Sequence, residues 1–87
     1  MQLDQNPDWR EIQKPNIGNI IHLKDSRNLG RLYKCIVTDA SDAILKAEVD
    51  CVFALDGSGE IVHGEGTEFK GKAVVVERSL VWKVIES

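Results

Sequence analysis

The chain is short of the residues that cross-link a protein or anchor it in a membrane. Two cysteines, two prolines and 6% aromatic residues are spread over 87 positions. No apolar run approaches the roughly 18 residues of a transmembrane helix, and the polar N-terminus has no signal-peptide core. Cys35 and Cys51 each lie inside an apolar, β-prone run, as free thiols do in reducing compartments. We therefore expect a single cytoplasmic domain with no membrane partner.

What the chain has is the alternation of apolar and polar residues that is typical of strands. The clearest signal is Asp56-Gly-Ser-Gly59, a turn between β-prone runs at 49–55 and 60–63, which predicts a hairpin. Further strands are predicted at 17–24, 31–38, 73–76 and within 80–85, with 73–76 central in the sheet. The predicted fold is mainly β: a small, partly open barrel of five or six antiparallel strands.

Two other segments are less regular. Residues 1–16 form an N-terminal arm in which Asn6 and Pro7 predict one short helical turn, with Asn6 as its cap, ahead of a barrel domain over 17–87. Residues 39–48 fit either a short helix capped by Ser41 or a turn and a strand from Ile44, and we favour the strand. Alternation also predicts further core residues. They are Phe53, Phe69, Val75 and Leu80.

The order of these elements is similar to that of a Src-homology-3-like barrel, over about residues 17–86. The segment Val76-Glu-Arg-Ser-Leu-Val-Trp82 resembles the passage of that fold's penultimate strand through a 3₁₀ turn into its last strand. The resemblance implies the fold and not polyproline recognition, because Tyr33 is the only tyrosine and Ser79 replaces the expected proline. Function has to be argued from the residues themselves.

Charge is distributed unevenly along the chain. The net charge is −3, but residues 17–34 carry +3 and residues 39–68 carry −7. An acidic surface of this kind attracts a basic partner. We therefore predict a non-catalytic protein-binding or adaptor module that uses an acidic hairpin surface, with Trp9 either as a contact anchor or as a pin for the N-terminal arm. The predicted partner-binding residues are Trp9, Asp50, Asp56, Glu60, Glu65 and Glu68.

Two alternatives remain open. The first is a nucleic-acid-binding barrel that uses the basic loop 24–34, although a pI of about 5.3 disfavours it. Its predicted residues are Lys24, Arg27, Arg31, Tyr33 and Lys34, with Tyr33 stacking on bases. The second is a homo-oligomeric structural component in which an edge strand such as 17–24 pairs with a second copy.

We predict no metal, no cofactor and no enzymatic activity. His22, Cys35, Cys51 and His63 are ligand types for zinc, but no two of them have the close spacing of a zinc motif. Asp56 and Glu60 lack the alternating oxygen ligands of a calcium loop and are better explained by the turn. The same scattered spacing argues against a cysteine nucleophile with a histidine base.

Overall fold

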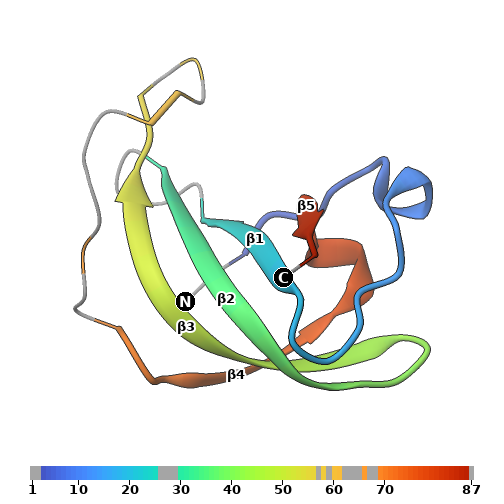
Figure 1. The fold of residues 1–87 in the computed structure, drawn as a ribbon. Coiled ribbons are helices and arrows are strands. Elements are labelled where there is room, and N and C mark those ends of the chain that lie inside the picture. The colour runs from blue at the N-terminus through green and yellow to red at the C-terminus, as the bar shows by residue number, and fades with distance from the viewer. Residues whose placement is uncertain are drawn as a thin grey trace.

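Five antiparallel strands form one sheet in a computed structural model that describes residues 3–25, 30–56, 58, 60–61, 66 and 69–86. The sheet order is β4-β3-β2-β1-β5, and the sheet is curled without closing (Figure 1). The strands are β1 (Ile20–Asp25), β2 (Arg31–Ala40), β3 (Ile44–Ala54), β4 (Ala73–Glu77) and β5 (Lys83–Ile85), and the 3₁₀ turns are η1 (Trp9–Glu11) and η2 (Arg78–Leu80). The prediction of a mainly β, partly open barrel is confirmed.

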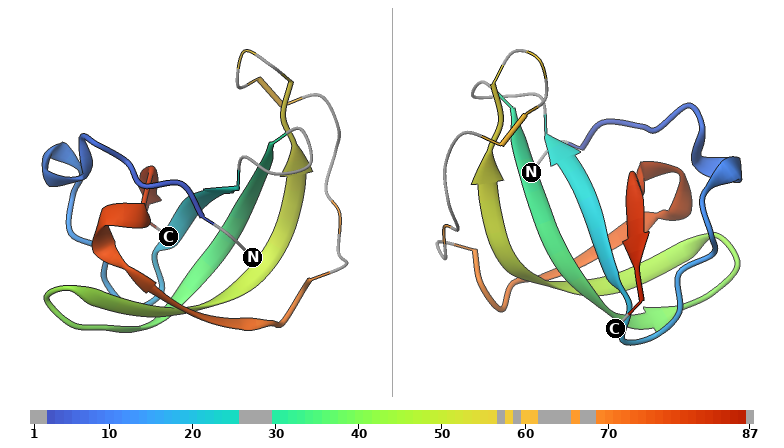
Figure 2. Two further views of the ribbon diagram at one scale, coloured as in Figure 1. Left: turned by 180° about the vertical axis from the view of Figure 1, so that it is seen from behind. Right: turned by 45° about the horizontal axis from the view of Figure 1, so that its top comes forward.

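The curl comes from the two longest strands, β2 and β3, which have 10 and 11 residues. Their register shifts between Lys34 and Cys35 and again between Val37 and Asp39. An extra residue on one strand bends a pair and increases its twist. Both strands therefore sweep around the core, as the two views of Figure 2 show, and η2 leads the chain from β4 at one edge to β5 at the other.

The concave face of the sheet holds the core. Ile21 and Leu23 on β1 are completely buried, as their alternation with His22 predicts. On β2 the predicted inner residues Tyr33, Cys35 and Val37 are also buried. The rest of the core cluster comes from β3, β4 and the segment before β5, namely Leu45, Ala47, Val49, Val52, Val76 and Val81.

The prediction that residues 73–76 form a central strand is wrong, because β4 lies at the edge of the sheet and pairs only with β3. Val75, predicted as a core residue, is 65% exposed, whereas its neighbour Val76 is 4% exposed. An uninterrupted apolar run does not show which alternate residues face inward. Of the other predicted core residues, Phe69 and Leu80 pack against the cluster while partly exposed, and Phe53 is half-buried.

The strand predicted at 17–24 begins later, at Ile20. Gly18 has a φ of 90°, and the side-chain oxygen of Asn19 accepts the N–H of Asn16 at 2.9 Å, so residues 16–19 form a turn. Ile17 is 66% exposed there. The expectation that this strand is an edge is also wrong, because β1 pairs with β2 on one side and β5 on the other.

Three other predictions agree with the structure. The strand after Ser41 begins at Ile44, and Ser41 closes the preceding turn by donating both its N–H and its hydroxyl to the Ile44 carbonyl. A 3₁₀ turn separates β4 from the last strand, as the resemblance implies. Of the predicted 60–63 strand, Glu60 and Ile61 are described, and Ile61 forms an isolated bridge with Leu55. Residues 62 and 63 lie outside the described residues.

The N-terminal arm is fastened to the end of the sheet where η2 lies. The buried side chain of Asn6 donates to the Val81 carbonyl at 3.0 Å, and its backbone N–H donates to the Ser79 carbonyl at 2.9 Å. The predicted helical turn is present as η1, but its cap residue is Asp8 rather than Asn6. Asn6 accepts the Asp8 N–H at 3.0 Å instead, which forms the turn just ahead of the 3₁₀ residues.

Candidate functional site

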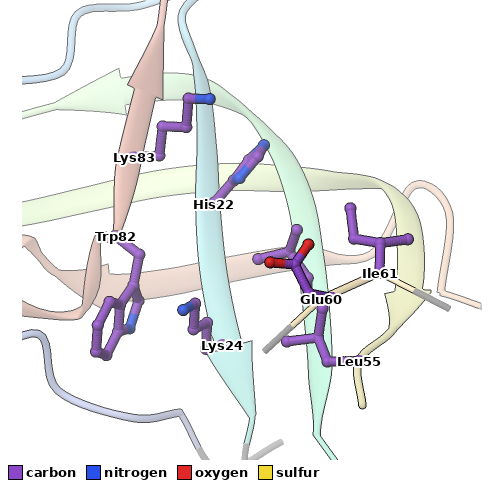
Figure 3. Close-up of a pocket in the computed structure, with 8 residues that line it drawn as sticks. His22, Lys24, Leu55, Glu60, Ile61, Trp82 and Lys83 are labelled. Atoms are coloured by element: carbon purple, nitrogen blue, oxygen red, sulfur yellow. The ribbon is translucent and has the colours of Figure 1, made fainter. Parts of the chain in front are cut away.

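A groove of about 380 Å³ lies on the convex face of the sheet, on the opposite side from the core. We call it the outer groove. Its walls come from β1, β2, the segment entering β5 and the 55–61 turn region (Figure 3). The lining residues are His22, Lys24, Leu32, Leu55, Glu60, Ile61, Trp82 and Lys83.

Strand pairing places three basic side chains in one line across this face. His22 on β1 is paired with Lys34 on β2 and with Lys83 on β5. Residues directly opposite one another in an antiparallel pair project from the same face, with Cβ atoms about 5 Å apart. We call Lys34, His22 and Lys83 the lysine row. Lys24, two residues after His22 on the same strand, extends the positive charge along β1.

The protonation of His22 reflects this setting. Partial burial lowers the pKa of its imidazole below the usual 6.5, and the positive charges of Lys83, Lys34 and Lys24 lower it further. Each cause disfavours the protonated ring. At neutral pH the groove therefore holds a neutral imidazole close to three ammonium groups. The charge of a group bound in the groove would shift the pKa of this imidazole.

Trp82 is held in a defined position at one end of the outer groove. Its indole N–H donates to the Asp4 carbonyl at 3.1 Å, and its backbone N–H donates to the His22 carbonyl at 2.9 Å. The Lys24 ammonium lies 4.4 Å from the centre of the Trp82 ring. Figure 3 shows the two side chains next to each other. The arm, β1 and the last strand thus build this end together.

The opposite wall is apolar and carries one acid. Leu32 projects from the convex side of β2 yet is only 5% exposed, because the 55–61 region lies beside it and lines the same groove. Ile61 remains 53% exposed at the rim. Glu60 follows the turn that leads out of β3 and lies across the groove from Trp82 (Figure 3).

A second hollow, of about 280 Å³, lies beside η1 and η2, and we call it the Trp9 hollow. The half-buried Trp9 ring has the guanidinium carbons of Arg10 and Arg78 at 4.6 and 5.4 Å from its centre. Arg78 also donates to the Ile12 carbonyl at 3.2 Å. The hollow is lined by Trp9, Asp42, Ala43, Ile44, Glu77, Arg78 and Ser79.

The described residues predicted for nucleic-acid binding lie on different faces of the sheet. Lys24 and Lys34 lie on the convex face, whereas Tyr33 is 3% exposed and packs its ring edge-on to Phe69 at 6.1 Å. The Tyr33 hydroxyl makes a long hydrogen bond of 3.4 Å to Asp25, so the stacking role expected of Tyr33 is wrong for this conformation. Arg31 starts β2 opposite Asp25 in register. Arg27 lies outside the described residues.

The residues predicted for an acidic hairpin surface do not form one described patch. Asp56 uses one carboxylate oxygen to accept the N–H groups of Ser58 and Glu60 and the Ser58 hydroxyl, and so shapes the turn. Asp50 is half-buried on β3, and Glu60 lines the outer groove. Glu65 and Glu68 lie outside the described residues. The acidic surface stays a prediction, and so does the role of Trp9 as a contact anchor.

The two thiols lie inside the fold. Cys35 and Cys51 are not joined in a disulfide and are 0% and 2% exposed. Burial raises the pKa of Cys35 to about 12, with further contributions from Cys51 and Asp50. A neutral, enclosed thiol is neither a nucleophile nor a metal ligand. Within the described ranges, no group of three His, Cys, Asp or Glu residues could hold a metal ion.

Sequence reasoning assigned Lys24 and Glu60 to binding surfaces and gave no such role to Lys83. Lys83 was treated only as part of the last strand, and Trp82 was considered as a contact anchor or a residue packed on the core, with the core favoured. Alternation along 80–85 could have placed Lys83 on the convex face. Nothing local places Lys83 beside His22, because that depends on β5 pairing with β1.

Fold and groove together define a small, open β-barrel with a basic and apolar groove on its convex face. No protein-family model, no curated protein and no solved structure matches the chain. No helix in the described part of the chain is long and apolar enough to cross a membrane.

Proposed function

We propose that this chain is a non-catalytic protein-binding module whose partner docks in the outer groove. The observation that carries the proposal is the composition of that groove, where Leu32, Leu55 and Trp82 lie beside Lys24 and Lys83 in one concavity. Protein interfaces combine an apolar centre with a polar rim in this way. Trp82 is already held by two hydrogen bonds, so little ordering is required when a partner binds.

The chemistry of the thiols supports a binding role. Cys35 and Cys51 are the strongest nucleophile candidates in the sequence, and both are enclosed, with the pKa of Cys35 raised to about 12. Buried cysteines that are not joined in a disulfide also support the cytoplasm as the proposed compartment, because a reducing environment keeps thiols from forming disulfides.

The test is a pull-down of the tagged chain from its native cell extract after nuclease treatment. A Lys24→Gln/Lys83→Gln double variant removes two positive charges from the outer groove. The matched control is Lys46→Gln/Lys70→Gln, which removes the same charge from exposed positions elsewhere. We expect retained proteins to be lost with the first variant and kept with the second. Equal retention by both variants would place the docking surface elsewhere.

Nucleic-acid binding is the second candidate, favoured by the lysines that β1, β2 and β5 place on one face. Phosphate contacts by lysine make affinity fall steeply with salt. Binding of a labelled single-stranded oligonucleotide would be measured between about 50 and 200 mM salt. A flat response, or partners that survive nuclease, would remove this candidate.

A further inference from the structure

The lysine row is an unfavourable arrangement for the isolated chain. Lys34 and Lys83 are the direct cross-strand partners of His22, and Lys24 lies two residues away on the same face. Like charges placed opposite each other on a sheet are destabilising. None of the three ammonium groups forms an ion pair with a described residue. Among the described residues, these ammonium groups therefore have no carboxylate in ion-pair contact.

The net charge of the groove region shows which ligand would supply a compensating charge. Among the described residues in and beside the outer groove, three lysines accompany one lining carboxylate, that of Glu60. A partner that brings negative charge relieves the repulsion among the ammonium groups, and a basic partner increases it. The groove therefore selects against the basic partner that the overall charge of the chain would attract.

The apolar wall adds a second requirement. Leu32, Leu55 and Ile61 are aliphatic, and the Ile61 side chain is 53% exposed at the rim. While this apolar surface stays in contact with water it contributes no binding free energy. Covering it with an apolar side chain of a ligand removes it from water and contributes about 25 cal/mol per Å². The ligand therefore needs apolar side chains close to its negative charges.

We propose that the outer groove binds an acidic, apolar segment of a partner protein, with Asp or Glu carboxylates on the lysine row and Lys24, and a neighbouring apolar side chain against Leu32 and Leu55. This inference rests on the proposed protein-binding function and specifies the chemistry of the partner. In an extended segment successive side chains point to opposite sides, so alternate residues reach the groove.

An acidic protein segment fits better than a nucleic acid. Sequence-tolerant binding of single strands relies on bases stacking on open aromatic faces. In the outer groove the aromatic ring is Trp82, and the Lys24 ammonium already lies 4.4 Å from the centre of that ring. Tyr33, the other aromatic candidate, is buried. The three aliphatic residues offer contacts to Leu, Ile or Val side chains instead.

The experiment measures fluorescence polarisation of a labelled peptide with the central sequence Glu-Leu-Glu-Leu-Glu. Two control peptides carry Gln in place of every Glu, or Ser in place of every Leu, and a ten-nucleotide oligothymidylate represents nucleic acid. We expect the Glu-Leu peptide to bind tightest, and either replacement to weaken binding about tenfold or more. Amide chemical-shift changes in β1, β2 and β5 would locate the complex.

Two variants of the protein should change its affinity for the Glu-Leu peptide in opposite directions. Lys83→Gln should weaken binding of the Glu-Leu peptide about threefold to tenfold, because a charge-assisted contact is lost. Glu60→Gln should strengthen it, because it removes the one acid among the described residues that line the groove. Lys70→Gln, at an exposed position outside the groove, should leave affinity unchanged. The opposing effects separate a local contact from a general change in protein charge or folding.

Several results would overturn the inference. Weaker binding of the Glu-Leu peptide by Glu60→Gln would contradict the repulsion expected between Glu60 and the peptide carboxylates. Tighter binding of the oligothymidylate than of the peptide would assign the groove to nucleic acid. If the Gln peptide bound as well as the Glu peptide while the Lys24→Gln/Lys83→Gln variant still lost its cellular partners, the protein-binding function would hold and the acidic ligand would be wrong.

Discussion

The Lys24 ammonium lies 4.4 Å from the centre of the Trp82 ring and so joins β1 to the segment that enters β5. A cation over an indole face at a partly exposed site contributes about 0.5–1 kcal/mol. Lys24→Met keeps the aliphatic stem and removes the charge, so we expect it to lower the free energy of unfolding by about that amount. Lys46→Met, at an exposed position on β3, is the control, and equal losses in urea denaturation would contradict a specific contact.

The His22 pKa makes stability depend on pH. The folded pKa lies below 6.5, since burial and the three lysines disfavour the imidazolium. Below pH 6.5 the unfolded chain binds a proton that the folded chain resists, so the free energy of unfolding should fall as the pH drops through this range. Urea denaturation between about pH 5 and 7.5, the range in which histidine titrates, checks this prediction. His22→Gln should flatten that part of the profile.

Adjacent residues of β4 should respond differently to truncation. Val76 is 4% exposed and belongs to the core, whereas Val75 is 65% exposed at the sheet edge. Val76→Ala should cost about 2 kcal/mol, from lost burial and the space left behind. Val75→Ala should cost about 0.5 kcal/mol or less, mainly through strand propensity. Urea denaturation of the two variants measures both values, and a reversed order would mean that β4 faces the other way.

The side-chain amide of Asn6 should contribute far more to the free energy of unfolding than the exposed side chain of Gln5 does. It is 4% exposed, donates to the Val81 carbonyl and accepts the N–H of Asp8. Asn6→Ala leaves both partners without these bonds, which should cost about 1–3 kcal/mol and speed proteolysis of the arm. Gln5→Ala, at an exposed position, is the matched control. A loss no greater than that of the control would show that the arm is held by other contacts.

The Cys35 thiol should be unreactive in the native protein. Its raised pKa should also lower the free energy of unfolding at alkaline pH. Its pKa is raised from 9.0 to about 12, so between these pH values the unfolded thiol loses its proton while the folded thiol retains it. The free energy of unfolding therefore falls as the pH rises from 9 toward 12. Labelling with a thiol reagent at pH 8 should require urea, and rapid labelling without urea would contradict the buried placement.

Local patterns predicted the inner faces of β1 and β2 well. Ile21, Leu23, Cys35 and Val37 alternate with polar or more exposed neighbours, and a period of two identifies which side chains share a face. The same reasoning failed at Val75, where every residue of the run is apolar and both alternate sets look equally suited to the core. The start of β1 was placed too early because Ile17 lies in a turn closed by Asn19.

Local sequence patterns predicted much less of the candidate site. Lys24 and Lys34 were predicted as parts of a basic loop over 24–34, but the aromatic residue was taken to be Tyr33, which faces the core. Trp82, the ring that does lie beside Lys24, is 58 positions further along the chain. Only the pairing of the last strand with the first brings the two together.

The sequence by itself determined a β-rich domain, the approximate strands, the 3₁₀ turn before the last strand and the unequal charges of its segments, because these depend on residues close in the chain. Tertiary structure decided which strands became edges and which side chains met. Lys34 and Lys83 are 49 positions apart, yet both are paired with His22. Lys34 and Lys83 come close together because β2 and β5 flank β1 in the sheet. This strand order depends on how the whole sheet buries its concave face.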